Sequence, residues 1–177
     1  SGVSDNEDND DFASAIGEAK KILFVENMQY IFEKFLDKSE GGNGDLLYDK
    51  VRQNDMIIAF VGDNSRFAGH TIVKSYEVSS ASYYGNLKFV PGLNLLQTTV
   101  VIPKTFNDSE LYQNTATSVP YTMVLDSLRY GLWLTKNNFV KYYPDNGKTY
   151  LQAYGREPVM VLENKGTFTG FAEQTSK

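Results

Sequence analysis

The chain has 177 residues, of which 41% are hydrophobic and 22% are charged, and it contains no cysteine. A chain of this length can bury a core without a metal or a disulfide, and the lack of cysteine excludes thiolate metal sites and cysteine nucleophiles. Five of the 22 acids lie in residues 1–12, which hold none of the 17 Lys and Arg, so the net charge of −5 leaves a neutral body with 17 of each sign. A neutral body does not favour nucleic-acid binding.

Residues 1–12, SGVSDNEDNDDF, are predicted to be a disordered acidic tether before a single globular domain over residues 13–177. Their composition resembles the segment that follows the lipidated cysteine in bacterial surface lipoproteins. This resemblance implies an extracytoplasmic or cell-surface location and a lipid anchor upstream of Ser1, and an ordinary flexible terminus is the alternative. The chain has no run of ~18 apolar residues, so no membrane span is predicted.

Residues 13–38 are predicted to form one long amphipathic helix. Phe24, Met28, Ile31 and Phe35 fall at helical spacing and mark an apolar stripe. The glycine-rich segment 40–44 that follows is typical of a helix end. We expect this stripe to be core rather than a ligand site.

The rest of the chain has the pattern of strands. Short apolar or alternating runs bounded by Gly, Pro and Asn predict strands over 55–62, 68–78, 86–92 and 95–103. The last third predicts further strands over 121–125, 128–135, 139–144, 149–154, 158–163 and 167–172. Because the breaks between the latter are short, we expect a C-terminal antiparallel β-meander. The predicted fold class is α+β, with the long helix packed on a mostly antiparallel sheet that can curl toward a barrel.

Asn146-Gly147 is the strongest local signal in the chain, because this dipeptide favours a two-residue hairpin turn with positive φ at both positions. The turn fixes a register between its two strands. It pairs Asp145 with Lys148, Pro144 with Thr149, Tyr143 with Tyr150, Tyr142 with Leu151, Lys141 with Gln152 and Val140 with Ala153. A phosphate loop would need more glycines and a following helix, and a calcium loop more carboxylates, so neither is favoured.

No catalytic residue, metal site or cofactor is predicted. His70 is the only histidine, and no GxSxG motif supplies a serine nucleophile, so a structural imidazole is the favoured interpretation. A pair of carboxylates could still act on a glycan. Asp55, Asp63, Glu77, Asp126 and Glu157 lie near predicted strand ends, and nothing in the sequence ranks one pair above another.

The aromatic content, with 12 Tyr and 11 Phe, is the remaining functional signal. The hairpin register places Tyr143 beside Tyr150 on its polar face, with Tyr154 further along, and exposed tyrosines can bind a protein or a glycan. The predicted function is therefore a non-catalytic, extracytoplasmic binding or interaction domain. The alternatives are a carboxylate-based hydrolase and a structural or capsid-like subunit.

Overall fold

The computed structural model describes residues 10–25, 43–53, 55–73, 87–103, 112–146 and 148–166. The helices are α1 (Asp10–Glu18), α3 (Asn43–Arg52), the 3-10 helix η1 (Gly62–Ala68) and α4 (Tyr112–Leu125). The strands are β1 (Lys21–Phe24), β2 (Ile57–Phe60), β3 (Thr71–Val73), β4 (Phe89–Pro91), β5 (Thr99–Ile102), β6 (Tyr130–Trp133), β7 (Asn138–Asp145), β8 (Lys148–Gly155) and β9 (Met160–Glu163). Of the tether predicted over residues 1–12, residues 1–9 lie outside the described ranges, and residues 10–12 form the start of α1 rather than part of a tether.

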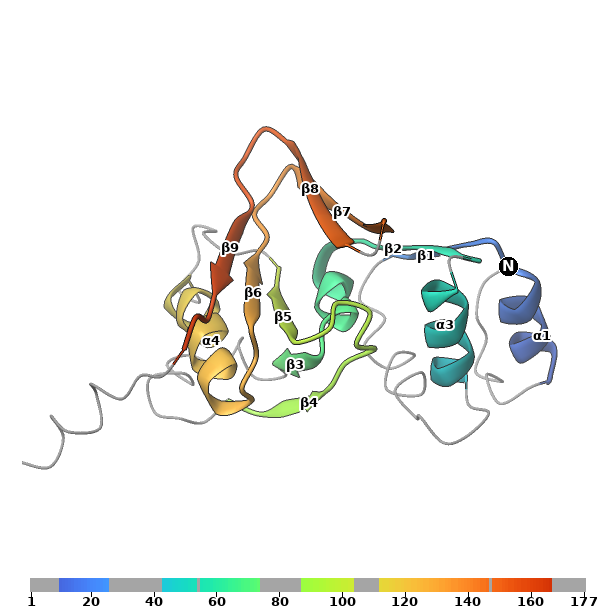
Figure 1. Ribbon diagram of the computed structural model, residues 1–177, viewed down its shortest axis with the longest axis horizontal. Helices are drawn as coiled ribbons and strands as arrows, with labels where there is room; N and C mark the ends of the chain where they lie inside the picture. Colours follow the sequence, from blue (N-terminus) through green and yellow to red (C-terminus); the bar gives the residue numbers. More distant parts are fainter. Residues whose placement is uncertain are drawn as a thin grey trace, which may run out of the picture.

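The described strands form three sheets (Figure 1). The largest has the order β4-β3-β5-β6-β9, and two-stranded sheets are formed by β1 with β2 and by β7 with β8. Three pairs are parallel (β1–β2, β3–β5, β5–β6) and three are antiparallel (β3–β4, β6–β9, β7–β8). The fold is α+β as predicted, but its pairing is mixed, and none of the described sheets closes into a barrel. The missed helix α4 explains one of the parallel pairs, because a helical crossover lets β6 return parallel to β5.

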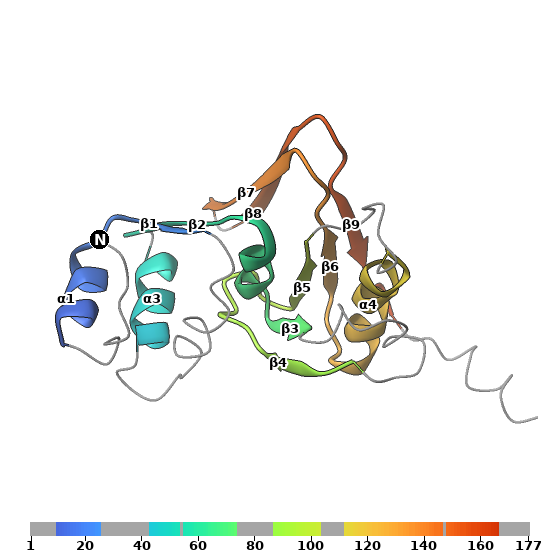
Figure 2. The same cartoon turned by 180° about the vertical axis from the view of Figure 1, so that it is seen from behind.

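β5 lies at the centre of the largest sheet, and all four of its residues are buried. Val100 and Ile102 share a core cluster with residues of α4, whereas Val101 packs in a second cluster that includes Ala68 of η1. The two helices therefore cover opposite faces of the sheet (Figure 2). β6 approaches α4 so closely that a Cβ at Gly131 would lie 2.2 Å from Cγ1 of the α4 residue Val119.

The parallel pair β1–β2 lies beside α1 and α3, at the other end of the molecule from α4 (Figure 1). Phe24 of β1 stacks on Phe60 of β2, with 5.2 Å between ring centroids. Phe24 also belongs to a core cluster that reaches Phe67 of η1 and Ile72 of β3. One continuous apolar contact thus joins this end to the five-stranded sheet.

The single long helix predicted over residues 13–38 is wrong. α1 ends at Glu18, and the chain enters β1 at Lys21, where Ile22 pairs with Ile58 of β2. The apolar residues of β1 that were assigned to a helical stripe therefore lie in a sheet. The remainder of the predicted helix, from residue 26, lies outside the described ranges.

Lys50 of α3 provides the physical reason for this early helix end. Its ammonium donates hydrogen bonds to the carbonyl oxygens of Ile16 (3.0 Å) and Ala19 (2.9 Å), and also to that of Gly17. The last carbonyls of a helix need partners from outside it, and a cation is favourable at that end. Lys50 is only 8% exposed, so it caps α1 from inside the core.

In the middle of the chain each predicted range contains a strand of three or four residues, and residues 74–78 of the range 68–78 lie outside the described residues. The predicted ranges 55–62, 68–78, 86–92 and 95–103 contain β2, β3, β4 and β5. In the last third, the ranges 128–135, 139–144, 149–154 and 158–163 correspond to β6, β7, β8 and β9. The range 167–172 lies outside the described residues.

The strand predicted over 121–125 is wrong, because these residues form the last turns of α4. Val119, Thr122 and Met123 are all buried, at a spacing that suits one side of a helix. The Thr122 hydroxyl donates to the carbonyl of Ser118 at 2.6 Å, a bond typical of a helical threonine. Packing against the sheet thus overrides the strand preference of this β-branched, apolar segment.

The predicted C-terminal meander is also wrong. A meander would pair β6 with β7 and β8 with β9, whereas β9 pairs with β6, and β8 pairs with β7. The four strands therefore form nested antiparallel pairs.

Replacement of Lys50 by methionine should lower the free energy of unfolding by about 2–4 kcal/mol, because it leaves one buried and two part-buried carbonyls at the end of α1 without their charged donor. Denaturant unfolding measures this. Lys20→Met is the control, since Lys20 is exposed and pairs with Asp55 at the surface, and we expect a far smaller effect. Equal stability of the Lys50→Met variant and the wild type would contradict the capping role.

Candidate functional site

The four C-terminal strands form a single long β-ribbon, residues 130–163, with one turn at its tip. Tyr130 pairs with Glu163 at its base, and Asp145 pairs with Lys148 beside the turn. Between the two paired regions each strand has four intervening residues, 134–137 on one side and 156–159 on the other. No residue is inserted on either side, so one register runs through the whole ribbon.

The ribbon bends where these intervening residues face each other. The Arg156 N–H donates to the carbonyl of Asn137 at 3.2 Å, and the Thr135 hydroxyl donates to that of Pro158 at 3.1 Å. Asn137 has a φ of 57° and Gly155 a φ of 126°, and a Cβ on Gly155 would lie 2.2 Å from the Asn137 carbonyl oxygen. Glycine is therefore required at position 155 to keep the strands paired through the bend.

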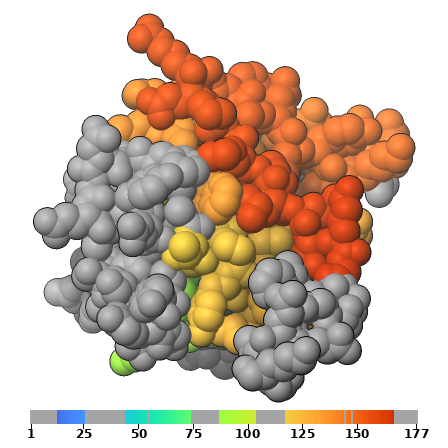
Figure 3. Space-filling model, turned by 90° about the vertical axis from the view of Figure 1, so that its left-hand side faces the viewer, coloured from blue at the N-terminus to red at the C-terminus, as the bar shows by residue number. Residues whose placement is uncertain are grey.

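Beyond the bend, β7, β8 and their turn form a projection that we call the arm, residues 138–155. Figure 1 shows β6 and β9 rising to the bend and the arm turning away from them over β2. Among the described elements, β7 and β8 pack extensively only with each other. In Figure 3 the orange and red atoms of the ribbon run along the upper and right-hand side of the molecule.

The register predicted for the arm is confirmed at all six pairs, from Val140–Ala153 to Asp145–Lys148. Asn146 has a φ of 49°, as the turn requires. The sequence also predicted that Tyr143 and Tyr150 are neighbours, and their rings stack with 5.6 Å between centroids and 18° between planes.

The side of the arm that carries these tyrosines is called the aromatic face. Phe139 stacks on Tyr154, with 4.7 Å between centroids, and the ammonium of Lys141 lies 4.7 Å from the centroid of Tyr143. Tyr150 and Tyr154 are 40% and 38% exposed, and Phe139 is 62% exposed. Tyr143 is half-buried. The three predicted binding residues thus lie together on one face, beside Phe139. Extending the predicted register by one more pair would have placed Phe139 on this face as well.

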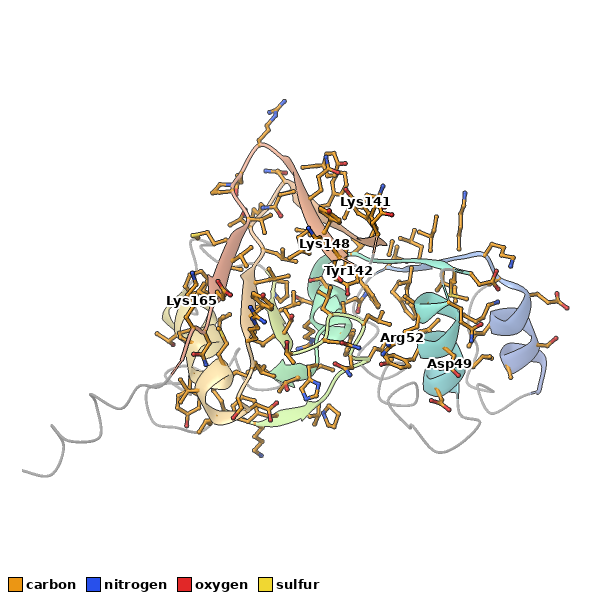
Figure 4. All side chains as sticks on the ribbon, viewed as in Figure 1. Asp49, Arg52, Lys141, Tyr142, Lys148 and Lys165 are labelled. Atoms are coloured by element: carbon orange, nitrogen blue, oxygen red, sulfur yellow. The ribbon has the colours of Figure 1, made fainter. Side chains whose placement is uncertain are left out.

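The opposite face of the arm carries Tyr142 and Leu151, which are 39% and 44% exposed. Figure 4 shows Tyr142 on the side of the arm that is nearer to α3, and Lys141 on the outer side. The hydrogen bond from Arg52 of α3 to the Tyr48 hydroxyl, 2.6 Å long, raises the pKa of Arg52 above its usual range, and the Tyr142 hydroxyl adds to that effect. The aromatic face therefore points away from α3.

A shallow depression of about 220 Å³ is the second candidate site. It is lined by His70, Thr71, Phe89, Val90, Pro91 and Asp126. Nδ1 of His70 lies 3.0 Å from Oδ1 of Asn94, and the Thr71 hydroxyl donates to the Asp126 carboxylate. The structure thus brings together the only histidine and one of the predicted acids, an association that their separation in sequence could not reveal.

The other predicted acids that the structure describes are not in this depression. Asp55 pairs with Lys20, which lowers the pKa of the Asp55 carboxyl, and Asp63 lies in η1. Glu157 lies in the bend of the ribbon, and Glu77 is outside the described residues. In the described ranges no three His, Asp or Glu side chains gather to hold a metal, and no helix there is long and apolar enough to cross a bilayer.

Comparison of the chain with protein-family models, curated proteins and solved structures found no significant match. The arm and the depression are therefore the two features from which function is inferred.

Replacement of Asn146 by valine should loosen the arm while the body stays folded. A β-branched residue in the left-handed conformation of Asn146 costs about 1–2 kcal/mol, and Asn146→Gly should cost little. Amide exchange followed by NMR should show faster exchange at Tyr143 and Tyr150 in the valine variant, with β5 unchanged. Exchange rates equal to those of the wild type would show that the turn does not hold the arm.

Proposed function

We propose that the chain is a non-catalytic interaction domain that binds a protein partner through the aromatic face of the arm. The observation that carries this proposal is the exposure of Phe139, Tyr150 and Tyr154 on a projection that has little contact with the body. Exposed clusters of large apolar side chains are uncommon on soluble proteins unless they bind something. Tyrosine is enriched at protein interfaces because it combines contact area with a polar tip.

The orientation of the rings favours a protein over a glycan. Side chains stand roughly perpendicular to a strand, and each ring here stacks against its cross-strand neighbour, with interplanar angles of 18° and 9°. The ring edges and the hydroxyls therefore point outward, whereas a sugar stacks on a ring face. Edges and hydroxyls suit the pockets and hydrogen-bonding groups of a protein surface.

The same proposal includes an extracytoplasmic or cell-surface location, with the acidic segment before α1, residues 1–9, as a tether that joins the domain to a lipid anchor. The acidic, Asn- and Ser-containing composition of that segment supports it. A solvated tether would hold the arm away from a surface and leave its aromatic face accessible.

A carboxylate-based hydrolase acting on a glycan is the second candidate. The supporting observation is that Asp126 and His70 line the same depression. Among the described residues Asp126 is the carboxylate in that lining, whereas hydrolysis by paired carboxylates needs a second one.

Alanine at both Tyr143 and Tyr150 should abolish partner binding with little loss of stability. The two rings are exposed or half-buried, so losing their stacking should cost about 0.5–1.5 kcal/mol of unfolding free energy. The measurement compares the proteins that immobilised wild type and variant retain from an extract of the source cells, with a glycan array in parallel.

Tyr142→Ala is the matched control. Tyr142 lies on β7 beside Tyr143 and is about as exposed as Tyr150, but it points to the opposite face of the arm. It should retain the partners that the double variant loses. Identical retention by wild type and double variant would refute the proposal, and binding to the glycan array alone would assign the face to sugars.

A further inference from the structure

The two strands of the arm have outer edges whose backbone groups follow from the register. The bond from the Arg156 N–H to the Asn137 carbonyl makes that pair a hydrogen-bonded one. Hydrogen-bonded and non-hydrogen-bonded pairs alternate in an antiparallel ladder. Tyr143–Tyr150 is therefore hydrogen-bonded, and the N–H and C=O groups of Thr149, Leu151 and Ala153 point away from β7.

The β8 edge lacks the features that usually prevent edge-to-edge pairing, namely proline, charge, bulges and short length. β7 carries Pro144, which has no N–H to offer on its outer edge, and β4 is only three residues long and ends in Pro91. β8 is eight residues long with every residue exposed, and from Thr149 to Tyr154 it has no charge and no proline.

We propose that the outer edge of β8 pairs antiparallel with β8 of a second copy of this chain. A two-fold axis at Leu151 brings the outward-facing N–H and C=O groups of the two β8 strands opposite each other. The facing residues are Leu151 with Leu151, Thr149 with Ala153, Tyr150 with Gln152 and Lys148 with Tyr154. The two arms then form one four-stranded sheet in the order β7-β8-β8-β7.

The charges of β8 favour this register over a shift toward the bend, and they suit an identical strand as the occupant. Lys148 meets the ring of Tyr154 of the second copy, a favourable cation–aromatic contact. A shift that moved the axis to Gln152 would instead place Lys148 opposite Arg156 of the second copy, where like charges repel. Because the edge carries no other charge, an identical strand fits it without an unpaired ion.

Pairing with a second copy would also stabilise the arm. A two-stranded sheet is marginally stable in water, whereas three or more strands with an apolar face are stable. Leu151, which is 44% exposed, would pack against its own copy at the axis. This inference rests on the proposed role of the arm in interaction, and it leaves the aromatic faces of both copies open on one side of the joined sheet.

A single cysteine tests the axis directly, because the native chain has none. In a hydrogen-bonded antiparallel pair the Cα atoms lie about 5.5 Å apart, which suits a disulfide. Leu151→Cys treated with oxidised glutathione should form a covalent dimer in high yield. Tyr142→Cys, the cross-strand partner on the same face, should remain largely monomeric. Equal cross-linking of the two variants, or none for Leu151→Cys, would overturn the proposal.

Sedimentation equilibrium of chains without cysteine provides a second test of the dimer. The wild type should show a concentration-dependent dimer, and Ala153→Pro should weaken it by about tenfold or more through the loss of an outward N–H. Val140→Pro makes the same change at the paired position on β7 and should leave the dimer intact. A monomeric wild type that still loses partners on Tyr143 and Tyr150 replacement would refute the edge pairing alone and leave the proposed function standing.

Discussion

One register, set at the turn that contains Asn146, fixes which face of the ribbon, residues 130–163, each of its side chains occupies. Asn146 has a φ of 49°, and the pairing runs without insertion from Asp145–Lys148 to Tyr130–Glu163. A slip of one residue would move every side chain to the other face of the ribbon. The aromatic face and the open β8 edge both exist because this register holds.

The ribbon is anchored at one end and free at the other. At its base, β6 lies between β5 and β9. It packs closely against α4, which requires glycine at position 131. Past the bend, the arm has almost no support from the described body, and large side chains are exposed on both of its faces. The rigid core thus holds an exposed surface at a defined place, an arrangement that suits binding better than chemistry.

The residue pairing within the arm could be predicted from the sequence, because a two-residue turn fixes which residues face each other. Side chains along each strand then alternate between the two faces. Contacts between distant segments were not predictable. The end of α1 depends on Lys50, some 30 residues further along, and α4 depends on packing against β5. Two short segments, KNN (136–138) and GREP (155–158), resemble hairpin turns in the sequence. In the structure they face each other across one ribbon and form its bend. The depression joins His70 and Asp126 only through the fold.

Nuclear Overhauser contacts between Hα protons test the single register most directly. The non-hydrogen-bonded pairs bring Cα atoms to about 4.5 Å, so their Hα protons face each other. Strong cross-peaks are predicted for Tyr142–Leu151 and Val140–Ala153 in the arm, and for Leu132–Val161 on the other side of the bend. Cross-peaks displaced by one residue, or present only at the base of the ribbon, would contradict the account.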